Sequence, residues 1–165
     1  GICALGMTGA DCGIIVSHKR EAKPVDYGFV GDVDKVDSQR LVSIINQGIT
    51  PVLAPLTFDG HEHLLNTNAD TIAGETAKAM AHLYDVSLVY CFEKRGVLTN
   101  PDDDNSVIPE IHADNFAKLV EDGVVSGGMI PKIQNALQAV EAGVKRVIIT
   151  AAKGLDTESG TKILP

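Results

Sequence analysis

Short apolar runs rich in Val, Ile and Leu alternate with amphipathic segments along this chain, and this alternation limits its fold more than any other feature. The apolar runs occupy residues 14–16, 49–56, 86–92 and 147–149. Between them, residues 72–83 and 129–142 carry apolar side chains at helical spacing. Only 4 % of the residues are aromatic, so the core must be aliphatic, as in a buried parallel sheet. We therefore expect an α/β fold, a three-layer αβα sandwich around a mainly parallel sheet.

Local signals predict several element boundaries. The runs at 14–16 and 29–33 predict an antiparallel pair outside the main sheet. Asp37 or Ser38 can cap the helix that follows. Further along, Asp114 can cap another helix in the same way.

Two prolines interrupt the apolar run at 49–56. Because proline cannot donate to a strand ladder, we expect Pro51 and Pro55 to mark the ends of a strand rather than its middle.

Length and charge predict one domain without nucleic-acid or membrane partners. A chain of 165 residues is one ordinary domain, so we expect residues 1–165 to form a single unit. The net charge is −8 and the 14 Lys and Arg residues are scattered, which excludes the basic footprint of a nucleic-acid-binding protein. No apolar stretch approaches the ~20 residues of a membrane span. We expect a cytoplasmic protein.

The cysteines and histidines predict neither disulfides nor a metal site. Cys3, Cys12 and Cys91 are odd in number and stand among apolar or small residues, so we expect reduced thiols buried as small hydrophobic side chains. His61 and His63 follow an Asp-Gly turn, and no Cys or Asp cluster completes a zinc set. We expect these histidines in an exposed hairpin arm.

Amide and carboxylate side chains cluster where a helix is expected to begin. Residues 66–70 read Asn-Thr-Asn-Ala-Asp. In open α/β sheets, ligands bind beyond the carboxyl ends of strands, where helix N-termini present free N–H groups, so Asn66 and Asp70 are candidate binding residues. Helix capping by Asn68, with Asp70 complementing the helix dipole, explains the same residues without a ligand.

A second candidate site lies where two glycines lead into a helix. Residues 124–132 read Val-Val-Ser-Gly-Gly-Met-Ile-Pro-Lys. The glycines let the backbone approach a ligand without obstruction by Cβ atoms. Lys132 lies in the first turn, where a cation opposes the helix dipole at a cost of about 0.3–1 kcal/mol. The position predicts a compensating anion, a carboxylate such as Asp70 or a bound phosphate; a solvated surface lysine is the alternative.

The common signatures of other phosphate and hydrolase sites are absent from the sequence. There is no GxxxxGK[ST] loop, no GxGxxG after a strand, no GxSxG elbow and no HExxH. A nucleotide enzyme with this sequence must hold phosphates with other glycine loops and with lysines.

Three motifs in this order resemble the acetylglutamate kinase branch of the amino acid kinase family. They are Leu-Asn-Thr-Asn-Ala-Asp-Thr-Ile-Ala at 65–73, Gly-Gly-Met-Ile-Pro-Lys at 127–132 and Ala-Gly-Val-Lys-Arg-Val at 142–147. Shorter matches run from residues 6–11 to 160–163, so the resemblance covers the chain from end to end. It implies the amino acid kinase (carbamate kinase-like) fold, with this chain as the C-terminal, ATP-binding part.

The resemblance also implies an activity, partners and residue roles. The activity is ATP-dependent phosphorylation of the side-chain carboxylate of N-acetyl-L-glutamate, giving N-acetyl-L-glutamyl 5-phosphate in arginine biosynthesis, by a cytoplasmic homodimer. Asn66 would bind the acylated amino acid, Lys132 would neutralise charge on the transferred phosphoryl group, and Asp70 would hold the catalytic lysines. Mg²⁺ would arrive with the nucleotide. The nucleotide would lie against Glu93, Lys94, Arg95, Gly96, Val97 and Leu98, and against Val124, Val125 and Ser126.

Three features depart from the family pattern. Phe92-Glu93 stands where most members have Thr-Asp. The segment between Ile149 and Gly160 is short, which argues against an arginine-inhibited kinase. The family's N-terminal lysine-glycine loop, HGGG-like loop and substrate-reading arginine have no match, and the chain starts without Met in an apolar run. We therefore expect a sequence without its N-terminal part, with little or no kinase activity if these 165 residues are the entire polypeptide.

Three other hypotheses stay open. Variation at residues 91–95 suggests an N-succinyl-L-glutamate kinase. A second hypothesis is a catalytically inactive nucleotide-binding module. The third is a family kinase for uridylate, carbamate or aspartate, against which Asn66 argues.

Overall fold

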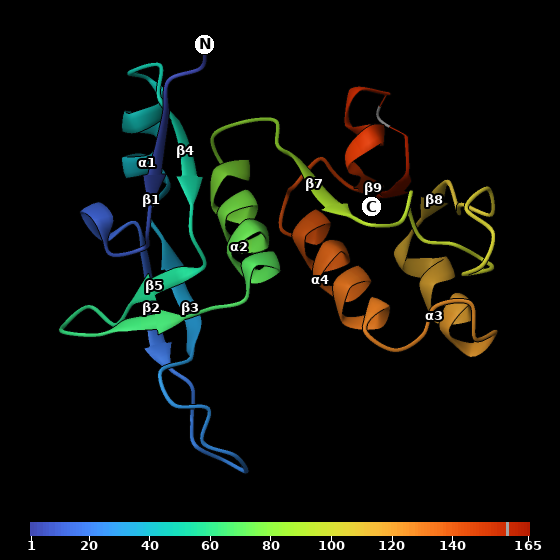
Figure 1. Cartoon of the computed structure of the whole chain (residues 1–165), viewed down its shortest axis with the longest axis horizontal. Helices are drawn as coiled ribbons and strands as arrows, with labels where there is room; N and C mark the ends of the chain where they lie inside the picture. The colour runs from blue at the N-terminus through green and yellow to red at the C-terminus, as the bar shows by residue number, and fades with distance from the viewer. Residues whose placement is uncertain (158) are drawn as a thin grey trace. The chain divides into compact units, whose positions relative to one another are not determined.

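The computed structural model describes residues 1–157 and 159–165 and divides into two compact units, residues 1–79 and 80–165 (Figure 1). Both units combine strands with helices, which confirms the expected α/β class. Parallel and antiparallel strand pairs are both frequent, so the pairing is more mixed than the sequence predicted. The single domain expected from the length stays a prediction.

The first unit contains two sheets. β1 (Ala4–Met7) and β4 (Thr50–Leu53) form a parallel pair. The second sheet has the order β3-β2-β5-β6, with β2 (Ile15–Lys19), β3 (Gly31–Val36), β5 (Leu56–Phe58) and β6 (Leu64–Asn66). β2 and β3 are antiparallel, as predicted, whereas β2 and β5 are parallel.

The helices of the first unit begin at the residues that their caps select. Asp37 caps α1 (Ser38–Ile45), because its side chain accepts a hydrogen bond from the backbone N–H of Arg40 at 3.1 Å. Asn68 opens α2 (Ala69–Ala81), since its Oδ1 accepts from the N–H groups of Asp70 at 2.8 Å and Thr71 at 3.2 Å. A short 3₁₀ turn, η1 (Asp11–Gly13), follows β1. Both capping predictions are confirmed.

Two expectations for the first unit are wrong in part. Pro51 lies within β4, opposite Leu5 of β1, and not at a strand end. Its missing N–H is tolerated because, among the described residues, β1 is the only strand paired with β4, which leaves the other edge of β4 without a ladder. Cys3 and Cys12 are exposed rather than buried, and so is Cys91 in the second unit.

The second unit is built on a four-stranded sheet with the order β7-β9-β10-β8. Its strands are β7 (Ser87–Phe92), β8 (Glu110–Ile111), β9 (Arg146–Ala151) and β10 (Thr161–Ile163). β7 runs parallel to β9, and β10 is antiparallel to β9 and parallel to β8. The sequence did not predict β8, because two residues are too short to show a period.

Helices α3 (Ala113–Glu121) and α4 (Met129–Glu141) and the 3₁₀ segment η2 (Ala152–Thr157) complete the second unit. α3 begins two residues earlier than predicted, because His112 is its N-cap and Asp114 lies within the first turn. The backbone N–H of His112 donates to Oδ1 of Asn115 at 3.0 Å, which fixes this start, so the prediction of Asp114 as the cap is wrong.

The core of the second unit is aliphatic, as the composition predicted. α4, which Figure 1 draws beside the sheet of this unit, packs on β9 and β10. The apolar face of α4 is buried. The apolar residues of this unit with no exposed surface are Ile111, Ile133, Ala136, Ala139, Val147 and Ile163.

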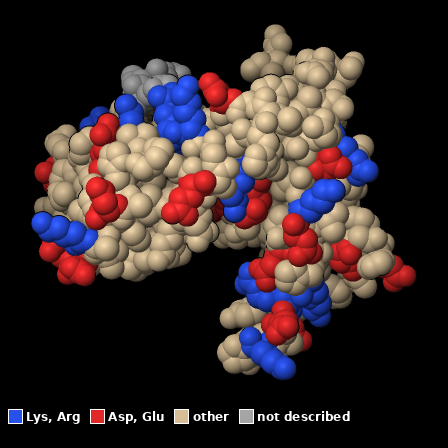
Figure 2. Space-filling view, turned by 180° about the vertical axis from the view of Figure 1, so that it is seen from behind, with Lys and Arg blue, Asp and Glu red and all other residues tan. Residues whose placement is uncertain are grey.

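The surface shows charges of both signs. On the face drawn in Figure 2, Lys and Arg side chains are interspersed with Asp and Glu, including on the hairpin that joins β2 to β3. There Arg20 pairs with Asp32 at 2.5 Å, and His18 pairs with Asp34 at 2.6 Å. Over the described part of the chain, none of the helices is both long enough and apolar enough to span a membrane.

We expect Ile133→Ala to destabilise the second unit by about 2–5 kcal/mol, because it removes a fully buried side chain and leaves a cavity beneath α4. Urea denaturation followed by circular dichroism measures the change. Ile2→Ala is the matched control, since Ile2 is 84 % exposed and should change stability by less than about 0.5 kcal/mol. Equal effects of the two substitutions would contradict the assigned core.

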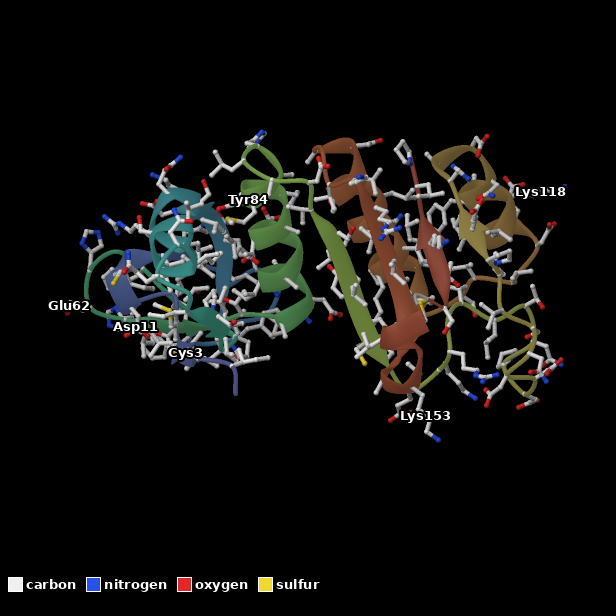
Figure 3. All side chains as sticks on the ribbon, turned by 90° about the horizontal axis from the view of Figure 1, so that it is seen from above. Cys3, Asp11, Glu62, Tyr84, Lys118 and Lys153 are labelled. Carbon is white, nitrogen blue, oxygen red and sulfur yellow. The ribbon has the colours of Figure 1, made fainter. Side chains whose placement is uncertain are left out.

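The turn between β5 and β6 is organised by one carboxylate. Oδ1 of Asp59 accepts hydrogen bonds from the backbone N–H groups of His61 at 2.8 Å, Glu62 at 3.0 Å and His63 at 3.1 Å. Glu62 lies at the outer end of this arm (Figure 3), and the expected exposed hairpin is confirmed. The N–H groups of His63 and then His61 hold the pKa of Asp59 well below its ordinary value of 3.8.

This lowered pKa makes the contribution of Asp59 to stability depend on pH. Because the folded pKa lies below the unfolded one, the carboxylate stabilises the turn above pH 3.8, and that contribution is lost as the pH falls through the folded pKa. We expect Asp59→Ala to lower Tm at neutral pH and the difference from the wild type to shrink below pH 3.8. Thermal melts across this range test it; a constant difference would show that the ionised carboxylate is not responsible.

Candidate functional site

The carboxyl ends of β7 and β9 define the site. Phe92 pairs with Ala151 at the end of the parallel register, so the segments that follow both strands leave the sheet at one edge. A cavity of about 510 Å³ opens there, between the end of β7 and the start of α4. It is lined by Cys91, Phe92, Glu93, Lys94, Gly96, Met129, Lys132 and Ile149.

A second, smaller cavity joins the two segments that the resemblance assigned to a nucleotide. It has a volume of about 180 Å³ and is lined by Lys94, Gly96, Val97, Leu98, Pro101, Val124, Ser126 and Met129. Val125 is the exception in its segment: it is 1 % exposed, and its N–H donates to the carbonyl of Leu119 at 2.9 Å. The fold therefore brings residues 94–98 and 124–126 together, with Val125 supporting the wall from behind.

A third cavity, of about 570 Å³, lies against the end of β9. Two of its lining residues, Glu93 and Arg95, were candidates from the sequence. Sequence reasoning missed the others because they come from the end of β9, from η2 and the residues after it, and from the long loop after β7, whose sequences carry no motif. Lys153 of η2 is marked in Figure 3. The missed residues are Asp104, Thr150, Ala151, Ala152, Lys153, Gly154 and Ser159.

Lys132 lies half-buried in the first turn of α4. Its Nζ is 3.6 Å from the centroid of the Phe92 ring. An ammonium over an aromatic face is attracted by the negative face of the ring, so Phe92 is one partner that offsets the unfavourable helix dipole. The sequence predicted an anion in this role and gave no signal for the ring, because the contact depends on how α4 packs beside β7.

Charges of both signs surround the three cavities. The cations are Lys94, Arg95, Lys132 and Lys153, and the carboxylates are Glu93 and Asp104. Nζ of Lys94 is 3.4 Å from Oδ1 of Asp104 and 3.2 Å from the carbonyl of Pro101. These contacts hold the side chain of Lys94 against a later part of the same loop. Within the residues that the structure describes, no group of three His, Cys, Asp or Glu side chains could hold a metal ion.

Gly96 permits the close approach of the loop to β10. A Cβ atom at this position would lie 2.8 Å from Oγ1 of Thr161 and 2.9 Å from Cγ1 of Val107. The same Oγ1 accepts a hydrogen bond from the N–H of Val97 at 2.8 Å. The loop therefore keeps its place along the sheet only with glycine at position 96.

The remaining candidates, Asn66 and Asp70, belong to the first unit. Asn66 ends β6 with an exposed side chain, and its N–H donates to the carbonyl of Phe29 at 2.8 Å. Asp70 lies in the first turn of α2. The structure places both residues at the junction of β6 and α2, where the sequence predicted them.

Known proteins resemble this chain over almost its whole length. Residues 1–151 match the amino acid kinase family. An acetylglutamate kinase from Bacteroides thetaiotaomicron is 58 % identical over 163 residues, which cover 99 % of this chain and 63 % of that protein. An acetylglutamate kinase from Methanopyrus kandleri is 39 % identical, over 98 % of this chain and 66 % of its own length. The chain thus spans somewhat less than two thirds of the curated relatives it matches.

Solved structures show the same fold. The Streptococcus mutans protein smu.665 aligns with a TM-score of 0.80 at 27 % identity, over 99 % of this chain and 62 % of that one. A carbamate kinase from Giardia aligns with a TM-score of 0.67 at 16 % identity, over 98 % and 62 %. At 16 % identity, the similarity to the Giardia carbamate kinase concerns the fold alone, and it agrees with the expected carbamate kinase-like architecture.

We expect Gly96→Ala to destabilise the second unit by about 1–3 kcal/mol, because the new Cβ must displace Thr161 or Val107. Thermal denaturation measures the loss. Gly128→Ala is the control: its φ of −66° suits alanine and a Cβ there would meet nothing within 4 Å, so its stability should change by less than about 1 kcal/mol. A neutral Gly96→Ala would contradict the close approach.

Proposed function

The chain belongs to the amino acid kinase family, and we propose that it is the nucleotide-binding part of an acetylglutamate kinase. Such an enzyme transfers the terminal phosphoryl group of ATP to the side-chain carboxylate of N-acetyl-L-glutamate. The observation that carries the proposal is the meeting of Lys94 and residues 96–98 with Val124 and Ser126 beside the Lys132 cavity. The 58 % identity to an acetylglutamate kinase supports the choice of substrate.

The residues that line the cavities suit the base and the phosphates of ATP. Val97, Leu98 and Val124 give the small cavity an apolar wall suited to a base. Lys94 and Lys132 line the larger cavity, where a chain of phosphates would find positive charge and the N-terminus of α4. Arg95 and Lys153 add positive charge at the neighbouring cavity.

The reaction needs positioning and charge stabilisation rather than a protein nucleophile. The substrate carboxylate is ionised at neutral pH, so it attacks the terminal phosphorus without a general base. A bond forms between a carboxylate oxygen and that phosphorus, and the bond from phosphorus to the bridging oxygen breaks as ADP leaves. Lys132 would neutralise the negative charge on the phosphoryl group during transfer.

The other assignments extend this proposal to the first unit and to the metal. Asn66 would bind the acylated amino acid, and Asp70 would hold the catalytic lysines. Mg²⁺ would bind mainly through phosphate oxygens and water and neutralise phosphate charge; Glu93, at the edge of the cavity, is a carboxylate that could contact it. Arginine biosynthesis, a homodimer and a cytoplasmic location stay predictions.

We expect a protein that contains this chain and has the full length of its relatives to phosphorylate N-acetyl-L-glutamate with ATP. In a coupled assay, Lys132→Ala should lower kcat by about 10²–10³-fold, because it removes a cation from the phosphoryl group in the transition state. Lys118→Ala is the control: this exposed lysine of α3 lines none of the three cavities (Figure 3).

Parallel assays separate the alternatives. Higher kcat/KM with N-succinyl-L-glutamate would change the acyl group and leave the rest of the proposal intact. Binding of an ATP analogue, measured by calorimetry, without turnover of either substrate would favour the non-catalytic module. Phosphorylation of uridylate alone would overturn the assignment to acylated glutamate.

A further inference from the structure

The ring of Phe92 lies under the ammonium group of Lys132, and a second aromatic ring lies beside it. The Phe92 ring is 3.6 Å from Nζ of Lys132, measured to its centroid. On the same strand, the ring of Tyr90 lies 6.0 Å from that of Phe92 with an interplanar angle of 16°. Tyr90 is 5 % exposed, so the second ring is fixed in the core of the unit.

We propose that Phe92 is a positioning residue, whose ring face holds the ammonium of Lys132 at the wall of the 510 Å³ cavity, ready for the terminal phosphate of ATP. This inference rests on the proposed function, in which Lys132 meets that phosphate. It adds a residue that the family resemblance identified only as a departure from the usual pattern.

The ring of Phe92 offsets two energetic costs of placing a lysine at position 132. A lysine has a flexible four-carbon stem, and fixing it costs rotamer entropy that a preformed surface offsets. The ammonium also opposes the dipole of α4, and the negative face of an aromatic ring attracts it there. Because a phenyl ring carries no net charge, it holds the cation without cancelling its attraction for phosphate.

The pairing of β7 with β9 fixes the position of Phe92. Phe92 is the last residue of β7, and its backbone is registered against Ala151 of β9. The ring can therefore move little along the strand, while its half-buried side chain still reaches the cavity. A substitution at this position changes the contact with Lys132 without removing a fully buried core side chain.

The test uses two substitutions at the site and one matched control. Phe92→Leu keeps an apolar side chain but removes the aromatic face, and Phe92→Tyr keeps the face. Phe29→Leu is the control, because it removes another lysine–ring contact, 5.2 Å from Nζ of Lys19 to the ring centroid, in the first unit. Circular dichroism melts confirm that each variant is folded.

The first readout is nuclear magnetic resonance of the 165-residue chain with labelled lysine. The ring should shift the terminal methylene protons of Lys132 upfield, and Lys132→Arg assigns that signal by its loss. We expect the shift to vanish in Phe92→Leu and to persist in Phe92→Tyr and Phe29→Leu. A wild-type signal at the ordinary lysine position would overturn the proposal.

The second readout is calorimetry with ADP and a non-hydrolysable ATP analogue. If Phe92 positions Lys132 for the terminal phosphate, Phe92→Leu should reduce the preference for the triphosphate by between about twofold and thirtyfold and leave ADP affinity unchanged. Phe92→Tyr should restore the preference. Equal weakening of both nucleotides would show a merely structural role and overturn the proposal.

The two readouts distinguish this inference from the proposed function. If neither nucleotide binds the wild-type chain, the proposed function fails, and the role of Phe92 toward phosphate fails with it. The upfield shift would still establish Phe92 as the residue that holds Lys132. If both nucleotides bind but the shift is absent, the proposed function stands and the inference about Phe92 is wrong.

Discussion

The parallel pairing of β7 with β9 is the constraint on which the candidate site depends. Six residue pairs, from Ser87 with Arg146 to Phe92 with Ala151, hold the two strands in one register. Since both strands end at the same edge, the loop after β7 and the η2 segment after β9 leave the sheet side by side. A slip of one residue would turn Phe92 to the other face of the sheet and remove it from Lys132.

The site also depends on the close approach of the backbone at Gly96 to β10. Gly96 lets the loop after β7 lie along β10, and Thr161 then accepts the N–H of Val97. This contact ties the loop, which lines all three cavities, to the core strand β10. The loop is thus held by the sheet and not only by its own turns, which suits a surface that must keep its shape around a ligand.

Much of the local structure was predictable because its causes are local. Asp37 and Asn68 cap their helices through side-chain bonds to N–H groups two or three residues away, and such bonds leave a mark in the sequence. The wrong predictions have non-local causes. His112 replaced Asp114 as a cap because Asn115 bonds back to it. Pro51 is tolerated inside β4 because, in the part of the chain that the structure describes, β4 pairs with β1 alone. The exposed cysteines show that apolar neighbours in sequence do not measure burial in space.

The sequence by itself determined the α/β class, most of the helices and strands, and the family motifs that single out Asn66, Asp70 and Lys132. These follow from periodicity, capping chemistry and residue order, all of which operate over a few residues. Only the tertiary structure decided that Lys94 and residues 96–98 share a cavity with Val124 and Ser126. It also decided that Lys153 and Asp104 line a cavity with Glu93 and Arg95, and that Lys132 lies on the ring of Phe92. The physical reason is that strand register and helix packing join residues tens of positions apart, and no spacing within a single segment records which of them will meet.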